Sequence, residues 1–234
     1  LLFVLDEMSP GIRPLGAASR WWLHHCLTAL AESVGGALVL RRGAAEEIVP
    51  AVVAETDAGA VYWNRRYSAA REIDARLKQR LRDQGVDAQS FQGNLLFEPW
   101  TITTGQGEPY KVFTPFWRAC LENGVREPMP VPAVEWVSIR PSGYGGSDVL
   151  DEWQLLPTRP DWAAGLRETW TPGEAGAQAR LAHFVAGPLD NYHRRDEPAV
   201  EATSMLSPHL RFGEVSPFQV WKAAHGVSSN SAKF

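Results

Sequence analysis

The chain has 234 residues, of which 44% are hydrophobic and 21% are charged, and its formal net charge is −4. This composition is typical of a globular protein with a real core. It excludes a protein that binds nucleic acid through its net charge, although a local basic patch remains compatible with it. Two cysteines, Cys26 and Cys120, are too few for a zinc framework, and no metal site is expected.

No apolar run approaches the length of a membrane span, and no signal segment opens the sequence. We therefore expect a protein of the reducing cytoplasm that does not bind membranes.

The first part of the chain alternates short apolar runs with helical patterns. Strands are predicted at 1–5, 37–40, 60–63 and 86–92, and helices at 19–32, 46–55 and 69–84. Because the links are short, the predicted fold class is α/β, with a Rossmann-like parallel sheet and flanking helices. Asp6 follows the first strand, at the sheet edge where ligands gather, although a turn or cap role is the simpler one.

The pattern changes from residue 94 onward. Thr114 and Pro115 predict a capped helix that runs to about Asn123. The segment 125–171 is rich in proline, glycine and tryptophan and has no clear period, which is typical of a long connection between domains. A further helix is predicted over 173–194.

Two Ser-Pro pairs, at 207–208 and 216–217, each predict a helix that starts with a hydroxyl cap, and Gly213 predicts the end of the first helix. Unpaired N–H groups at a helix start favour phosphate. Three hydroxyls lie at the first start: Thr203, Ser204 and Ser207. The spacing alone is compatible with simple caps and with a nucleotide phosphate site.

Several motifs together resemble the photolyase and cryptochrome family. They are Tyr-His-Arg-Arg-Asp-Glu-Pro-Ala at 192–199, Thr-Ser-Met-Leu-Ser-Pro-His-Leu-Arg-Phe-Gly-Glu-Val-Ser-Pro at 203–217, Phe-Glu-Pro at 97–99, Tyr-Lys-Val-Phe-Thr-Pro-Phe-Trp at 110–117, Gly-Ala-Ala-Ser-Arg-Trp-Trp-Leu at 16–23 and Asn-Arg-Arg-Tyr at 64–67. The resemblance covers essentially the whole chain. It points to the N-terminal and central part of a bacterial class I cyclobutane pyrimidine dimer photolyase.

The resemblance implies three parts. Residues 1–123 resemble the α/β antenna domain without its first strand, 124–171 resemble the interdomain linker, and 172–234 resemble the truncated start of an all-α FAD-binding domain. The catalytic residues and the tryptophan relay are expected in a helical half beyond Phe234.

The same resemblance implies the binding residues. Tyr192 resembles a tyrosine at the phosphate region of the flavin. A following stretch resembles one whose hydroxyls and backbone amides hold the FAD pyrophosphate: Thr203, Ser204, Met205, Leu206 and Ser207.

Arg195 resembles an arginine that meets a phosphate of damaged DNA, for which a guanidinium is well suited. An ion pair with Asp196 or Glu201 is the alternative role. Because the linker is one residue shorter than in most relatives, Arg194 is the alternative in register.

The implied function is that of a deoxyribodipyrimidine photo-lyase, a carbon–carbon lyase in which reduced FAD uses light to repair pyrimidine dimers in DNA. This chain alone is expected to be inactive, and the intact protein is expected to be a monomer. A second antenna chromophore, a deazaflavin or a folate, stays open, because residues 68–72 do not reproduce the Asn-Glu of folate-binding relatives. The alternatives are a cryptochrome-type blue-light photoreceptor and a generic nucleotide-binding α/β protein.

Overall fold

A computed structural model gives the fold of residues 1–137, 146–225 and 227. The chain divides into two compact units. The first unit comprises residues 1–91 and 133–173, and the second comprises residues 92–132 and 174–234. Each unit is defined by the contacts among its own residues. The three-part division expected from the sequence stays a prediction.

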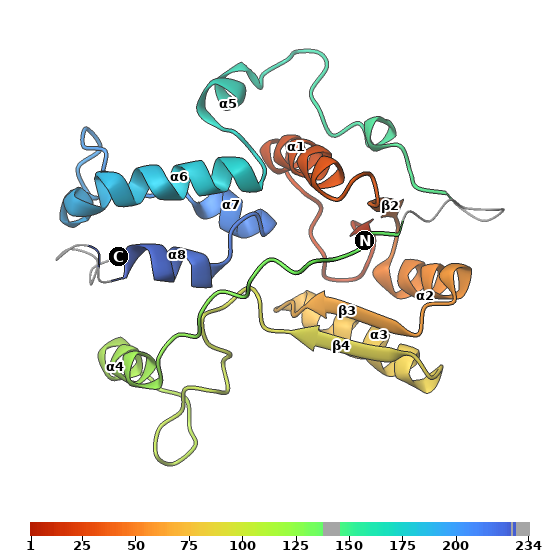
Figure 1. The fold of residues 1–234 in the computed structure, drawn as a ribbon, viewed down its shortest axis with the longest axis horizontal. Coiled ribbons are helices and arrows are strands. Elements are labelled where there is room, and N and C mark those ends of the chain that lie inside the picture. The colour runs from red at the N-terminus through yellow and green to blue at the C-terminus, as the bar shows by residue number, and fades with distance from the viewer. Residues whose placement is uncertain (138–145, 226, 228–234) are drawn as a thin grey trace. The chain divides into compact units, whose positions relative to one another are not determined.

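The first unit alternates strands and helices along the chain, as the labels in Figure 1 show. Its elements are β1 (Leu2–Leu5), α1 (Ala17–Ser33), β2 (Val39–Arg42), α2 (Ala45–Thr56), β3 (Ala60–Asn64), α3 (Ala69–Asp83), β4 (Asp87–Phe91), the 3-10 helix η1 (Leu150–Trp153) and α5 (Ala164–Thr169). β1 pairs with β2, and β3 with β4, both in parallel. Among the described residues the strands form two small sheets, and the predicted α/β class with parallel strands is confirmed.

Several strand and helix boundaries differ from the prediction by one or two residues. The second strand begins at Val39 rather than at Ala37, since Ala37 and Leu38 are buried before ladder pairing starts. α1 begins at Ala17 with Gly16 as its N-cap, so Ser19 lies inside the helix.

The helices α2 and α3 cover the β3–β4 sheet through one apolar cluster. Leu77 and Leu81 of α3 pack against Ala88 of β4 and are at most 5% exposed. Most of the other residues of α3 are charged or polar, so only one stripe of this helix is buried.

Most of the segment expected to be a linker, from residue 133 onward, belongs to the first unit, whereas residues 124–132 belong to the second. Trp153 of η1 is 4% exposed, and its C=O accepts a hydrogen bond from Nη2 of Arg20 at 3.2 Å. Trp170 meets Trp22 of α1 edge-on at 5.4 Å between ring centroids. The N–H of Asp148 donates a hydrogen bond to the C=O of Leu40, which joins this segment to β2 as well. Sequence periodicity missed η1 and α5 because both are shorter than two helical turns.

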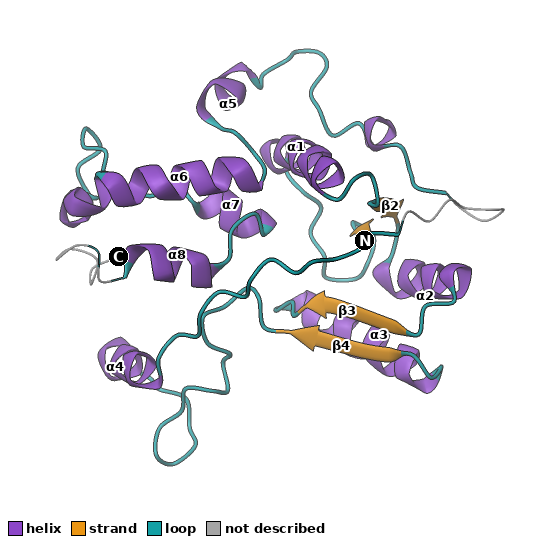
Figure 2. Ribbon diagram, in the orientation of Figure 1, coloured by secondary structure: helices purple, strands orange, loops and turns teal. Residues whose placement is uncertain are grey.

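The elements of the second unit are all helical (Figure 2). They are α4 (Phe113–Asn123), α6 (Glu174–Ala186), the 3-10 helix η2 (Pro188–Arg194), α7 (Ser207–Phe212) and α8 (Pro217–Ala224). The helix predicted over 173–194 is broken at Gly187 and Pro188, because proline has no N–H to continue the ladder. α4 begins one residue before Thr114, which therefore does not cap it.

A compact apolar cluster joins α6, α7 and α8. It consists of Ala177, Leu181, Leu206, Val215 and Val220. Trp117 of α4 meets Trp221 of α8 edge-on at 5.8 Å, so α4 is held to the same unit by an aromatic contact. None of the helices among the described residues is both long enough and apolar enough to cross a membrane.

Candidate functional site

The predicted binding residues all lie in the second unit, between α6 and α8. Tyr192 belongs to η2, and Arg195 follows η2 directly. The loop of residues 203–206 leads into α7, whose first residue is Ser207. The structure therefore collects these residues on one short stretch of chain, and their binding roles stay predictions.

Tyr192 is half-buried against the core. Its ring meets Phe184 of α6 edge-on at 6.3 Å, and it packs on the cluster that contains Leu189 and Ala224. The guanidinium carbon of Arg195 lies 5.1 Å from the centre of the Tyr192 ring, within the range of a cation–π contact. The tyrosine and the exposed arginine are therefore next to each other in space.

The neighbouring arginine has a different environment. Arg194 binds Glu197 with two hydrogen bonds, at 2.9 and 2.7 Å, and these bonds lower the pKa of Glu197. Glu201 was the alternative partner of Arg195, but its Oε1 lies 2.8 Å from Nε2 of His183. The geometry thus gives Arg194 a carboxylate partner and places Arg195 over an aromatic ring.

The loop before α7 has an unusual backbone. Met205 takes a φ of +52°, and Leu206 follows with φ −87° and ψ −5°. A positive φ is uncommon for a residue other than glycine and marks a backbone conformation that its surroundings hold in place. The Ser204 hydroxyl accepts a hydrogen bond from the N–H of Leu206 at 3.4 Å.

The predicted cap at Ser207 is wrong. The N-cap of α7 is Leu206, and no side chain caps this helix. Leu206 is 1% exposed, so its burial in the core draws it into a helical conformation and moves the helix start back by one residue. The hydroxyls of Thr203 and Ser207 belong to exposed residues. Exposed hydroxyls can donate hydrogen bonds to phosphate oxygens, so the residues present fit a nucleotide.

The two other local signals are confirmed. Gly213 ends α7 with a φ of +73°, a conformation that glycine adopts without strain. Ser216 caps α8 in a reciprocal box with Gln219: the Ser216 hydroxyl accepts from the N–H of Gln219, and the Gln219 side chain accepts from the N–H of Ser216.

One buried polar pair was missed from the sequence. His209 and Glu214 have side chains that are each 2% exposed, with Nδ1 of His209 2.5 Å from Oε2 of Glu214. No residue spacing signals such a pair, because burial is decided by the packing of the folded unit.

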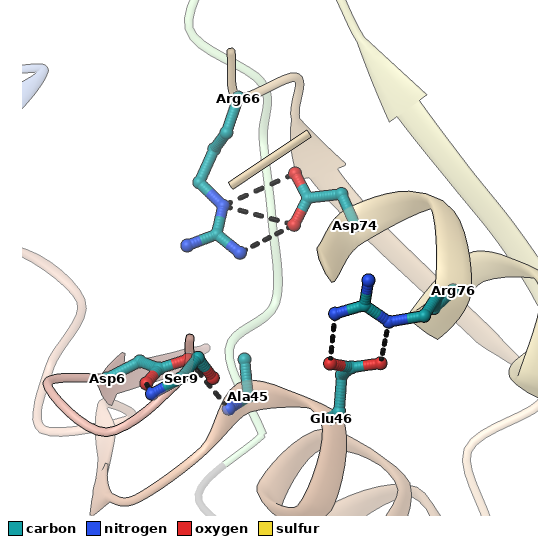
Figure 3. A network of polar contacts seen from close by, with 7 residues as sticks. All are labelled: Asp6, Ser9, Ala45, Glu46, Arg66, Asp74 and Arg76. Atoms are coloured by element: carbon teal, nitrogen blue, oxygen red, sulfur yellow. Dashed lines mark hydrogen bonds and ion pairs between the residues drawn. The ribbon is translucent and has the colours of Figure 1, made fainter. Parts of the chain in front are cut away.

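In the first unit, polar contacts gather after β1 and β3, as Figure 3 shows. The Asp6 carboxylate accepts hydrogen bonds from the N–H of Met8, from the N–H and hydroxyl of Ser9, and from the N–H of Ala45 at the start of α2. Burial alone would raise the pKa of Asp6, but these hydrogen bonds outweigh it and the pKa is lowered. The turn and cap role expected for Asp6 is therefore confirmed.

Two ion pairs lie close to Asp6. Arg66, which follows β3, binds Asp74 of α3 with the shortest contact at 2.6 Å. Arg76 of α3 binds Glu46 of α2 with two hydrogen bonds of 2.9 and 2.8 Å, and these lower the pKa of Glu46. The first pair joins the segment after β3 to α3, and the second joins the start of α2 to the middle of α3. Among the described residues, no three His, Cys, Asp or Glu side chains converge as metal ligands would.

Comparisons with known proteins show the family of the chain. The chain is 47% identical over 233 residues to a deoxyribodipyrimidine photo-lyase of Agrobacterium fabrum, covering 97% of this chain and 48% of that protein. It is 33% identical to Cryptochrome-1 of Arabidopsis thaliana, covering 94% of this chain and 33% of that protein. The chain thus spans about half the length, or less, of these curated relatives.

A solved structure gives the same result. The crystal structure of a bacterial class III photolyase from Agrobacterium tumefaciens matches with a TM-score of 0.84 and 44% identity, covering 98% of this chain and 48% of that chain. The class I assignment expected from the motifs is not the class of this relative, and it stays a prediction. The sequence model for DNA photolyase matches residues 1–133, more than half of the chain. The chain belongs to the DNA photolyase family.

Proposed function

We propose that the chain is part of a deoxyribodipyrimidine photo-lyase, a carbon–carbon lyase that repairs cyclobutane pyrimidine dimers in DNA. The observation that carries this proposal is the 47% identity, along 97% of the chain, to a protein of that name. Because the chain spans about half of that relative, repair is proposed for the whole protein and not for these residues alone.

The cofactor of this proposal is FAD, which would supply light-driven electron-transfer chemistry when bound. Tyr192 and the loop of residues 203–207 would hold its phosphates. The exposed hydroxyls of Thr203 and Ser207 support this role, since they can donate hydrogen bonds to phosphate oxygens.

Arg195 is proposed to bind a phosphate of the DNA. Its side chain is exposed and lies over Tyr192, while the neighbouring Arg194 is engaged by Glu197. A phosphate contact of this kind positions DNA without reading its sequence.

The remaining expectations belong to the same proposal. Residues 1–123 would form the antenna domain without its first strand, 124–171 the linker and 172–234 the start of the FAD-binding domain. A second chromophore, a deazaflavin or a folate, would bind the antenna domain. The intact protein would be a cytoplasmic monomer.

A second candidate is a cryptochrome-type photoreceptor without repair activity. The 33% identity to Cryptochrome-1 supports this second candidate. The same phosphate loop would serve either protein, so binding of FAD alone does not separate the two.

The first experiment is to sequence the DNA on both sides of this reading frame and to express the whole gene product. We expect a yellow protein with flavin absorbance that restores thymine absorbance at 260 nm in dimer-containing DNA under blue light. Flavin binding without repair would favour the photoreceptor. A colourless product that cannot be loaded with FAD would overturn both candidates.

A further inference from the structure

The second unit buries a histidine and a glutamate against each other. The side chains of His209 and Glu214 are each 2% exposed, and their nearest polar atoms are 2.5 Å apart. Burying such groups costs free energy even when they bond each other. Apolar side chains of similar size would fill the space without that cost, so packing alone does not explain this pair.

The pair closes the C-terminal end of α7. Besides the side-chain contact, the N–H of Glu214 donates to the C=O of His209 at 2.9 Å. Gly213 between them allows the chain to turn. α7 has only six residues, too few to be stable through its own hydrogen bonds. Its position therefore depends on contacts such as this one.

The N-terminal end of α7 continues the loop of residues 203–206. The N–H of Leu210 donates to the C=O of Leu206 at 2.9 Å, and Leu206 shares a core cluster with Val215, the residue after Glu214. Met205, beside Leu206, has a positive φ that a non-glycine residue adopts only where its surroundings enforce it. The shape of the loop is thus coupled to the seating of α7.

We propose that His209 and Glu214 form a positioning pair that holds α7, and through it the loop of residues 203–207, in the shape that receives the cofactor pyrophosphate. The identity of the ligand rests on the proposed function. The effect of the pair on the loop does not, and it can be measured without any cofactor.

The test compares two His–Glu pairs in one unit by amide hydrogen exchange on the 234-residue chain. Glu214→Gln keeps the shape of the buried pair and removes its charge. Glu201→Gln is the matched control, because Glu201 binds His183 at 2.8 Å with both side chains more than half exposed. We expect amide exchange at Met205, Leu206 and Ser207 to become about tenfold faster in Glu214→Gln and to stay unchanged in the control.

The location of the change decides the outcome. Faster exchange confined to the loop and α7 supports the proposal. An equal acceleration in α6 and α8 would mean that the pair only stabilises the whole unit, and unchanged exchange would mean that it does not hold the loop. Either result would overturn the proposal.

A double variant separates the effect of the pair on the loop from its effect on the stability of the protein. His209→Phe with Glu214→Leu replaces the pair by apolar side chains, which often preserve or raise stability. We expect an unchanged or higher melting temperature together with a loop that still exchanges faster. A fully protected loop in a folded double variant would contradict the proposal.

The whole gene product supplies the second readout. We expect Glu214→Gln to raise the Kd for FAD about tenfold and Glu201→Gln to leave it unchanged. Equal affinity of the wild type and Glu214→Gln would remove the link to the cofactor. If the wild type itself binds no FAD, the proposed function fails, while the exchange measurements still decide what the pair does.

Discussion

Asp6 illustrates how one side chain joins two parts of the fold. Its carboxylate fixes the turn after β1 through Met8 and Ser9, and it binds the first N–H of α2 at Ala45. We expect Asp6→Ala to lower the free energy of unfolding by about 2 kcal/mol, since it removes a helix cap and several charge-assisted bonds. Urea denaturation measures this loss, and a change below the experimental error would contradict the role.

The stabilisation by Asp6 depends on pH. Because its pKa in the folded protein is lowered, its contribution is present above about pH 4 and is lost as the pH falls through the folded-state value. The difference in stability between the wild type and Asp6→Ala should be constant from pH 7 to pH 5 and should shrink at pH 3. An equal difference at pH 7 and pH 3 would show that the charge of Asp6 does not matter.

We expect different effects from substituting the two adjacent arginines. In the whole protein, Arg195→Ala should weaken DNA binding and reduce the salt dependence of the affinity by about one released ion. Arg194→Ala should change neither, because Glu197 already engages Arg194. Fluorescence anisotropy at several salt concentrations tests both. Weaker DNA binding in Arg194→Ala and unchanged binding in Arg195→Ala would show that Arg194, and not Arg195, contacts the DNA.

At the scale of the element, two Ser-Pro starts that look alike in the sequence are built differently. Ser216 caps α8 through its hydroxyl, whereas Ser207 is the first helical residue of α7 and the side chain of its N-cap, Leu206, makes no capping bond. We expect Ser216→Ala to cost about 1 kcal/mol of stability and Ser207→Ala only a few tenths. Thermal unfolding of the two variants side by side provides the comparison, and equal losses would contradict the assigned caps.

At the scale of the whole molecule, residues 133–171 of the segment expected to be a linker belong to the first unit. Trp153 is buried and is tied to Arg20 in α1. Trp153→Ala should destabilise the first unit by about 3–5 kcal/mol and expose residues 147–170 to protease. Limited proteolysis with mass spectrometry of the fragments tests this. Rapid cleavage of this segment in the wild type would show that it is a free linker.

By itself, the sequence determined the features that depend on neighbouring residues. The alternation of apolar and helical runs predicted the parallel α/β unit, Gly213 and Ser216 marked a helix end and a helix start, and the combined motifs indicated the family. These signals are readable because turns, caps and periodicity arise within a few residues.

Features that depend on distant parts of the chain became visible in the folded structure. Burial of Leu206 moved the start of α7, contacts with α1 and β2 docked the apparent linker, and the core of the second unit enclosed His209 with Glu214. Burial is a property of the packed molecule, since the residues that exclude water from a side chain lie far from it in the sequence.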